Sequence, residues 1–399
     1  MTPYRVAYLV SHPIQYQAPM LRRLAAHPEV ALQVYFMDDQ GARLYQDPEF
    51  GVPIQWDVPL LDGYASRVLR NRSPWPAGDH ALRFIHPEIA GALRRGRFDA
   101  LIVHGYAHAT EWLAFATARL MGTPLLIRGE SILLGRPATW RGRVKRSARA
   151  ALLRRVQGAL AIGVLNREFY RAHGVPDDRI FFTPYAVDND RFTGDADRLR
   201  PRRDALRAEL GWPREAPVIL AAGKLIPRKR PHDVLEAYAG LAGEMPAALV
   251  FLGEGGERAP IEAEAARRGL RHVYVTGFVN QAEISRYYAA ADVVVLASSH
   301  EPWGLTLNEG MCFGLPVVAS SMVGAAADLV RPEENGFVYP VGDVPALRAA
   351  LRAVLADPDR RARMGARSRS LIAGYSYDAD VRGVLDALRA VCAPRAYGG

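Results

Sequence analysis

The sequence of 399 residues predicts an α/β protein made of two doubly wound, parallel-sheet domains. Short apolar runs that end in Gly, His or polar loops alternate with helix-period segments along the whole chain, which is typical of βα units. Apolar residues make up 49% of the chain and charged residues 23%, a composition that supports large cores and excludes a disordered or collagen-like protein.

The strands are expected where aliphatic runs of four to six residues occur. In the first half these runs are 5–10, 32–36, 100–104, 124–128, 159–164 and 180–183, with a helix over 111–121. In the second half they are 218–223, 248–253, 273–276, 293–297 and 316–319, each separated from the next by a helix-sized gap.

The domain junction is expected within residues 186–217, which are rich in Asp, Arg and Pro and carry no strand run, only a short helical stretch at 202–210. We therefore predict an N-terminal domain over 1–190, a C-terminal domain over 191–375, and a tail over 376–399. The tail holds a helix near 379–391 that is expected to pack back on the N-terminal domain. In such folds ligands bind at the carboxyl ends of the strands, here in a cleft between the domains.

The compartment expected from the sequence is the cytoplasm. The two cysteines, Cys312 and Cys392, are too far apart to form a metal cluster or a disulfide framework. No apolar run approaches the roughly 18–20 residues that span a bilayer. Peripheral attachment to the inner face of the membrane stays open.

The chain carries 51 Lys and Arg against 42 Asp and Glu, a formal charge of +9, which suggests an anionic partner. Between Glu130 and Glu168 there is no acidic residue, while nine Lys and Arg residues occur. Within this stretch, residues 136–155 are amphipathic if helical. The apolar face would hold Val144, Ala148, Ala151 and Leu152, and the basic face Arg141, Lys145 and Arg149.

Two interpretations of this basic segment stay open: docking on an anionic membrane or on a lipid-linked or phosphorylated acceptor, or a solvated face packed on its own domain. Nucleic acid is not expected as a partner, because no aromatic residues interleave the arginines after Trp140.

The densest chemical signal is the segment 298–310, which follows an apolar strand, turns through a Pro-x-Gly sequence and opens a helix. Such a turn presents free backbone N–H groups and the positive end of a helix dipole, which suits a phosphate. The carboxylates of Glu301 and Glu309 could reach different parts of one ligand, since a carboxylate accepts hydrogen bonds from vicinal hydroxyls. The spacing alone is equally compatible with two solvated surface charges.

These residues form a Glu-x7-Glu pattern with Pro-Trp-Gly-Leu inside it and Gly-Leu-Pro-Val-Val-Ala at 314–319. The pattern closely resembles the signature of glycosyltransferase family 4, the retaining, nucleotide-sugar-dependent type. The resemblance covers most of residues 184–340, in the family's order. It continues through Pro184–Asp188, Gly223–Leu225, Arg228–Arg230, Leu252–Gly255, Thr276–Val279 and Glu334–Phe337.

The resemblance implies a GT-B fold of two facing Rossmann-like domains, in which the domain over 1–190 binds the acceptor and the domain over 191–375 binds the nucleotide-sugar donor. It also implies that Glu309 binds the ribose of the donor and that Glu301 binds the transferred sugar. It places Lys224 and Lys229 on the diphosphate and extends the donor site to Gly253, Phe278, Val279, Gly304 and Leu305. The family usually has Arg where Lys224 stands, and a lysine offers a point charge instead of a planar fork. By itself, the 224–230 segment also fits a basic surface loop.

The N-terminal half matches the family less well, because the first strand runs into Ser11–Pro19 without the usual Gly-Gly loop. His12 and Tyr16 at this strand end, and His104 at another, are predicted to bind the acceptor. Arg128 and Glu130 end the next strand and join this set, with Glu130 near the reacting centre as a catalytic carboxylate. The alternatives are that the histidines are structural and that Glu130 only pairs with Arg128.

No metal and no cofactor are expected. Four Asp-x-Asp triplets occur, at 188–190, 195–197, 357–359 and 378–380, but none follows an apolar strand. The predicted function is retaining transfer of a hexose-type sugar from a nucleoside diphosphate sugar to an acceptor hydroxyl, in polysaccharide, glycolipid or glycoconjugate biosynthesis. A nucleotide-sugar epimerase and a catalytically silent nucleotide-sugar-binding partner remain alternatives. A dehydrogenase is disfavoured because the Gly-x-Gly-x-x-Gly fingerprint is missing.

Overall fold

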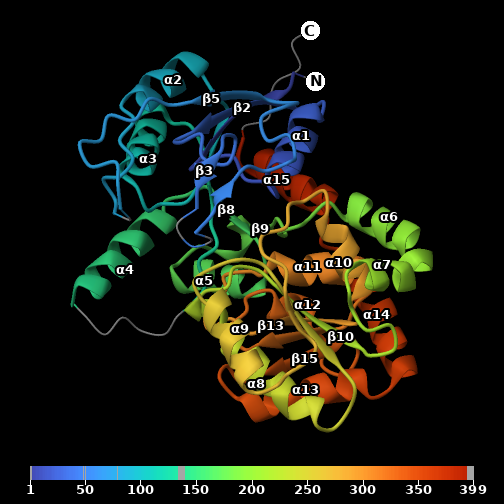
Figure 1. Ribbon diagram of the computed structural model, residues 1–399. Helices are drawn as coiled ribbons and strands as arrows, with labels where there is room; N and C mark the ends of the chain where they lie inside the picture. The colour runs from blue at the N-terminus through green and yellow to red at the C-terminus, as the bar shows by residue number, and fades with distance from the viewer. Residues whose placement is uncertain (1, 48, 50, 79, 134–139, 393–399) are drawn as a thin grey trace. The chain divides into compact units, whose positions relative to one another are not determined.

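The computed structural model describes residues 2–47, 49, 51–78, 80–133 and 140–392, and it divides into two compact units (Figure 1). Unit 1 comprises Met1–Leu44, Pro59–Tyr185 and Tyr377–Gly399. Unit 2 comprises Tyr45–Val58 and Ala186–Ser376. The chain therefore passes between the units four times, and a short piece of the N-terminal half belongs to unit 2.

Unit 1 is built on a seven-stranded, all-parallel sheet in the order β5-β2-β1-β6-β7-β8-β9. Its strands are β1 (Tyr4–Val10), β2 (Val30–Phe36), β5 (Ala65–Val68), β6 (Ala100–His104), β7 (Leu125–Arg128), β8 (Gly158–Ala161) and β9 (Ile180–Phe182). The central strands are buried along nearly their whole length, as expected when helices cover both faces of a parallel sheet.

Five helices of unit 1 alternate with these strands in the βα order that the sequence predicts, and a sixth comes from the C-terminal end of the chain. They are α1 (Ala18–Ala26), α2 (Glu88–Gly96), α3 (Ala109–Met121), α4 (Trp140–Leu153), α5 (Val164–Ala172) and α15 (Tyr377–Val391), with a 3-10 turn η1 (Asp177–Arg179).

Unit 2 is built on a six-stranded parallel sheet in the order β12-β11-β10-β13-β14-β15. Its strands are β10 (Val218–Ala222), β11 (Ala248–Leu252), β12 (Val273–Val275), β13 (Val293–Leu296), β14 (Val317–Ser320) and β15 (Gly336–Tyr339), and it also holds the antiparallel hairpin β3 (Tyr45–Gln46) and β4 (Pro53–Ile54). Its helices are α6 (Asn189–Leu199), α7 (Arg203–Glu209), α8 (Pro231–Ala242), α9 (Arg258–Arg267), α10 (Ile284–Ala290), α11 (Leu305–Cys312), α12 (Ala326–Leu329), α13 (Val344–Leu355) and α14 (Pro358–Ile372), with 3-10 turns η2 (Arg200–Arg202) and η3 (Pro227–Lys229).

The architecture confirms the predicted α/β class with two doubly wound sheets, and it corrects several details. The strand predicted over 159–164 ends at Ala161, because α5 begins at Val164. The junction contains α6, which the sequence analysis missed. Elsewhere in the chain it also missed β5, β15 and the β3–β4 hairpin. The segment 45–58, predicted within the first domain, belongs to unit 2, and the units divide after Tyr185 and before Tyr377 instead of at 190 and 375.

The C-terminal helix α15 packs within unit 1 against α1, β8 and β9, as Figure 1 shows. Its anchor is an ion pair in which the Arg128 guanidinium donates to both carboxylate oxygens of Asp380, at 2.9 and 2.7 Å. The two side chains are 1% and 4% exposed. Gly383 allows α15 to approach β9 closely, because a Cβ there would lie 1.9 Å from the carbonyl oxygen of Phe182.

Among the helices of the described residues, none is long and apolar enough to cross a bilayer.

We expect Asp380→Asn to lower the free energy of unfolding by about 3–5 kcal/mol, because it leaves the buried Arg128 charge without its counterion. Chemical denaturation measures this. The matched control is Asp378→Asn, which breaks the exposed pair with Arg23 and should cost less than about 1 kcal/mol. Equal effects of the two variants would contradict the anchoring role.

Candidate functional site

The loop after β13 sets up the candidate donor site at the carboxyl end of the unit 2 sheet. Gly304 caps α11 with φ +110°, and a Cβ there would lie 2.7 Å from the Leu296 side chain. Trp303 is buried and fixes the turn, since its indole N–H donates to Asn308 Oδ1 at 2.9 Å. The first N–H groups of α11 therefore lie at the strand end, with Leu305 partly buried as the first helical residue.

Glu301 lies at the centre of a charged group. Lys229 Nζ donates to Glu301 Oε2, and Ser298 Oγ donates to the same oxygen at 3.1 Å. The Arg228 guanidinium lies 3.9 Å away and is held by the carbonyl oxygen of His300 at 3.0 Å. Because Lys229 and Arg228 come from the turn after β10, the structure brings the predicted sugar ligand and a predicted phosphate ligand together.

Glu309 lies one helical turn into α11 and is partly buried. The phenol of Tyr288 donates to Glu309 Oε2. Burial raises the pKa of Glu309 to about 7, and the Tyr288 hydrogen bond opposes this shift. A carboxyl group that is half protonated near neutral pH accepts fewer hydrogen bonds than an ionised carboxylate.

Lys224 is paired with acidic residues of the β3–β4 hairpin. Its ammonium lies 3.1 Å from both Asp47 carboxylate oxygens and 2.8 Å from Glu49 Oε2. Asp47 is only 6% exposed. The sequence analysis missed these two carboxylates, because nothing in a polar loop 177 residues away indicates that it pairs with Lys224.

The segment 45–58 also contacts the rest of unit 2 near its C-terminal end. Asn280 Nδ2 donates to the Gln55 carbonyl oxygen at 2.7 Å, and Asp57 accepts from the Ala282 N–H at 3.0 Å. The rings of Trp56 and Phe278 lie 5.9 Å apart. Phe278, a predicted donor residue, thus contacts this segment, while its neighbour Val279 is partly buried after β12.

The glycines after β10 and β11 serve loop packing. A Cβ on Gly253 would lie 1.9 Å from the Gly223 carbonyl oxygen, and one on Gly255 would lie 2.3 Å from the Leu225 carbonyl oxygen. Gly223 itself has φ +136°. The two loops therefore approach each other closely, which is a structural reason for Gly253 that is separate from nucleotide approach.

A polar cluster at the carboxyl ends of the unit 1 strands contains Glu130. The phenols of Tyr16 and Tyr185 donate to Glu130 Oε1 at 3.1 and 2.6 Å. His104 Nε2 hydrogen-bonds Tyr185 at 3.1 Å, and its Nδ1 hydrogen-bonds Gln17 at 3.2 Å. Burial, with the nearby Arg128 charge, lowers the pKa of His104 to about 3, so the imidazole is neutral.

Tyr16, His104 and Glu130 thus belong to one hydrogen-bonded cluster, and the Arg128 guanidinium lies over the Tyr185 ring at 5.3 Å. Arg128 is buried and pairs with Asp380, and among the described residues no hydrogen bond or ion pair joins it to Glu130, its alternative partner. His12 hydrogen-bonds Ser11 Oγ at 2.9 Å, and burial lowers its pKa. Tyr185 also belongs to the cluster, although the sequence analysis assigns it no role and includes it only within the motif Pro184–Asp188.

Each of the four Asp-x-Asp triplets contains at least one aspartate with a structural role. Asp188 and Asp357 cap α6 and α14, Asp195 accepts from Ser285 Oγ at 2.7 Å, and Asp380 pairs with Arg128. Among the residues that the structure describes, no group of three or more His, Cys, Asp and Glu side chains could hold a metal ion.

The basic segment forms α4, with residues 134–139 and the side chains of Arg141 and Lys145 lying outside the described part. The Arg149 guanidinium lies over the rings of Tyr106 and Phe169, at 5.2 and 5.6 Å, so this arginine faces its own domain. Val144 on the predicted apolar face is 58% exposed. On α4, therefore, a residue of the predicted basic face packs on unit 1, while a residue of the predicted apolar face is exposed.

The chain has two α/β units, each built on an open parallel sheet, and this is the architecture of the GT-B glycosyltransferases. The solved structure of Anabaena HepE with UDP and glucose has this fold, and it matches with a TM-score of 0.72 at 17% identity, over 97% of this chain and 99% of that one.

Sequence comparisons identify the family. The model described as "Glycosyl transferases group 1" matches residues 202–371, and that described as "Glycosyl transferase 4-like domain" matches residues 14–186. The alpha-D-kanosaminyltransferase of Streptomyces kanamyceticus is 30% identical over 281 residues, 68% of this chain and 72% of that protein. The chain belongs to the family 4 type of glycosyltransferases.

A D-inositol 3-phosphate glycosyltransferase of Xylanimonas cellulosilytica is 35% identical over 224 residues, 55% of this chain and 53% of that protein. The chain spans about half the length of several curated relatives that it matches.

We expect Gly253→Ala to destabilise the protein by about 1–3 kcal/mol, since the added methyl group meets the Gly223 backbone. Thermal and chemical unfolding measure this. Gly256→Ala is the matched control, because nothing lies within 4 Å of a Cβ at that position. If Gly253→Ala unfolds like the control, close loop packing is not why glycine stands there.

Proposed function

We propose that the protein is a retaining glycosyltransferase that moves a sugar from a nucleoside diphosphate sugar to an acceptor hydroxyl without a metal ion. The observation that carries this proposal is the meeting of Lys229, Glu301 and Ser298 beside the N-terminus of α11. Ammonium groups and free N–H groups suit a diphosphate, and carboxylates suit sugar hydroxyls.

In this proposal, charge develops on the β-phosphate as the bond from the sugar to the phosphate breaks. Fixed cations at Lys224 and Lys229, with the positive end of the α11 dipole, stabilise that charge more in the transition state than in the ground state. Glu301 exchanges part of its contact with Lys229 for sugar hydroxyls, and Glu309 accepts from the ribose.

We further propose that unit 1 binds the acceptor, with Glu130 as the carboxylate nearest the reaction. The phenols of Tyr16 and Tyr185 orient Glu130 Oε1. Its other oxygen, Oε2, accepts no hydrogen bond from the residues that the structure describes, so it can receive an acceptor proton or face developing positive charge on the sugar.

We base the proposed acceptor class on the relatives of this chain. Those relatives include D-inositol 3-phosphate glycosyltransferases and a lipopolysaccharide core biosynthesis glycosyltransferase of Rhizobium meliloti. We propose an acceptor of glycolipid or glycoconjugate type, and an enzyme that works in the cytoplasm at the inner face of the membrane.

Transfer assays with labelled nucleotide sugars and a panel of acceptors test the function. We expect a product with the anomeric configuration of the donor, and a loss of about 10²–10³ in kcat for Glu301→Gln and Lys229→Met. Glu283→Gln, an exposed carboxylate of the same unit, is the control. An inverted product, or isomerisation of the donor without an acceptor, would overturn the proposal.

Donor affinity is expected to fall as the pH is lowered. Glu309 is ionised above its pKa of about 7, so the affinity is full near pH 8 and decreases by up to about tenfold per pH unit below 7. Calorimetric titration with UDP-glucose measures this, because its phosphate groups do not titrate in that range. Glu309→Gln should bind weakly with no such pH dependence, and a wild-type affinity that stays constant from pH 8 to pH 5.5 would exclude the ribose role.

The hairpin carboxylates are expected to compete with the donor diphosphate for Lys224. The double variant Asp47→Asn/Glu49→Gln should therefore bind UDP-glucose about three- to tenfold more tightly. Asp57→Asn is the control and should leave the affinity unchanged, because Asp57 lies on the same segment but accepts from the Ala282 N–H instead of pairing with Lys224. Weaker binding by the double variant would mean that the hairpin positions Lys224 instead of competing.

A further inference from the structure

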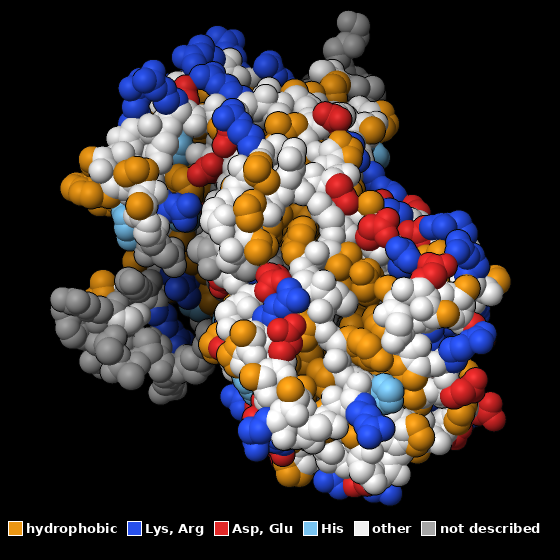
Figure 2. Space-filling model, in the orientation of Figure 1, with side chains coloured by type: hydrophobic (Ala, Val, Ile, Leu, Met, Phe, Trp, Pro, Cys, Tyr) orange, Lys and Arg blue, Asp and Glu red, His pale blue; other side chains and the backbone are white. Residues whose placement is uncertain are grey.

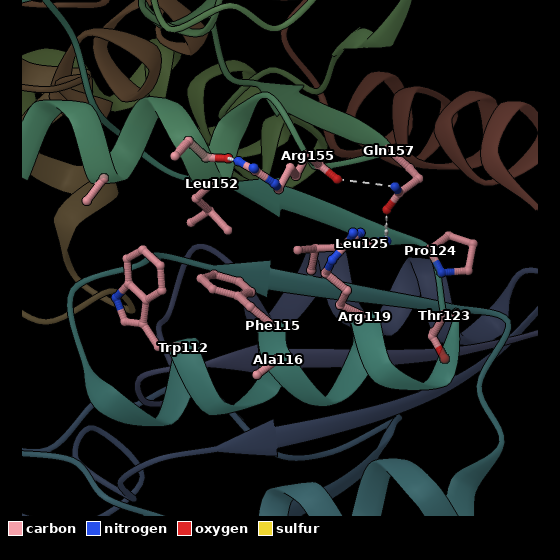
Figure 3. Close-up of a pocket in the computed structure, with 13 residues that line it drawn as sticks. Trp112, Phe115, Ala116, Arg119, Thr123, Pro124, Leu125, Leu152, Arg155 and Gln157 are labelled. Carbon is pink, nitrogen blue, oxygen red and sulfur yellow. Dashed lines mark hydrogen bonds between the residues drawn. The ribbon is translucent and has the colours of Figure 1, made fainter.

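A cavity of about 600 Å³ lies in unit 1 between α3 and α4 (Figure 3). Figure 3 shows Trp112, Phe115 and Arg119 projecting from α3 towards α4, and Leu152 projecting back from α4. The lining is otherwise small and apolar, and the loop residues 122–125 and Gln157 close one end. Nothing in the proposed sugar transfer uses this cavity.

The two helices line the cavity in the same way. The residues on α3 lie at positions i, i+3, i+4 and i+7, which form one helical stripe, and those on α4 continue the same spacing into the turn that follows it. These residues are Trp112, Phe115, Ala116 and Arg119 on α3, Ala148, Ala151 and Leu152 on α4, and Arg155 in the turn after α4. Each row is apolar along the helix, and an arginine lies near or just beyond the C-terminal end of the helix.

The two arginines have no acidic partner. Neither Arg119 nor Arg155 forms an ion pair with any residue that the structure describes, and no Asp or Glu lines the cavity. The Arg155 side chain only donates to the Ala151 carbonyl oxygen, at 2.6 Å. Most arginines of unit 2, in contrast, are paired with carboxylates.

The surroundings are both basic and apolar. Unit 1 holds 27 Lys and Arg against 15 Asp and Glu, a formal +12, while unit 2 holds 24 against 27, a formal −3. Figure 2 shows Lys and Arg side chains gathered over α2 of unit 1. Of the large apolar side chains exposed in the described residues, all but Val338 belong to unit 1. Trp112, Leu120, Leu133 and Val144, on or between α3 and α4, are among them.

A surface that combines exposed apolar side chains with unpaired arginines is typical of contact with an anionic membrane. We propose that the α3–α4 cavity binds an anionic membrane phospholipid, with one acyl chain along the apolar stripes and the phosphate between Arg119 and Arg155. The stripe from Trp112 to Arg119 is about 10 Å long at the rise of an α-helix, which gives room for most of a short acyl chain.

This lipid site is separate from the proposed acceptor cluster. The two arginines lie where α3 and α4 end, beside the start of β7 at Leu125. Glu130 follows the opposite, carboxyl end of β7. The proposal is therefore an anchor that holds unit 1 on a membrane, and it does not depend on which sugar or acceptor the enzyme uses.

The test is calorimetric titration of the full chain with lauroyl lysophosphatidate below its critical micelle concentration. We expect saturable binding of one molecule, and at least tenfold weaker binding of glycerol 3-phosphate, which lacks the chain, and of monolaurin, which lacks the phosphate. Arg119→Gln/Arg155→Gln should weaken binding at least tenfold, and Ala151→Trp should block it by filling the cavity.

Arg154→Gln/Arg179→Gln removes the same charge from exposed positions outside the cavity and is the matched control. It should bind lysophosphatidate like the wild type, and all variants should keep their affinity for UDP-glucose. The same order should hold for flotation with phosphatidylcholine vesicles that contain phosphatidylglycerol. No binding by the wild type, equal losses in both double variants, or equal binding of glycerol 3-phosphate would overturn the proposal.

Discussion

The pairing of Lys224 and Lys229 with carboxylates is the interaction on which the donor side of the molecule depends. Two ammonium groups at one sheet edge repel each other and lose hydration, so the fold supplies Glu301 for one, and Asp47 and Glu49 for the other. Unit 2 thereby keeps a slightly negative formal charge although it is the proposed phosphate-binding unit. In the proposed function, a bound diphosphate would therefore exchange one set of anions for another.

This exchange explains why a short hairpin of the N-terminal half belongs to unit 2. The segment 45–58 brings three acidic residues and no Lys or Arg. Its contacts with Asn280 and Ala282 fix it at one end, while Asp47 and Glu49 reach Lys224 at the other. A lysine in place of the family's usual arginine also fits, because a point charge shared among several oxygens needs no planar fork.

The strand cores could be predicted from sequence because buried parallel strands are nearly continuous apolar runs, and the predicted 100–104 coincides with β6. Gly336–Tyr339 was missed because it is a four-residue edge strand with an exposed valine. The turn and helix that carry Glu301 and Glu309 could be predicted because the residues that form them are adjacent in the sequence. The partners Asp380 and Asp47 could not, because they come from segments far apart in the sequence and only the fold brings them to Arg128 and Lys224.

We propose that the donor diphosphate replaces the carboxylates at Lys224 and shares Lys229 with Glu301. A crystal structure of the protein with UDP-glucose bound tests this most directly. The account predicts both ammonium groups within hydrogen-bond distance of diphosphate oxygens, with the Asp47 and Glu49 carboxylates more than about 4 Å from Lys224. A bound diphosphate that touches neither lysine, with the Asp47–Lys224 pair intact, would contradict it.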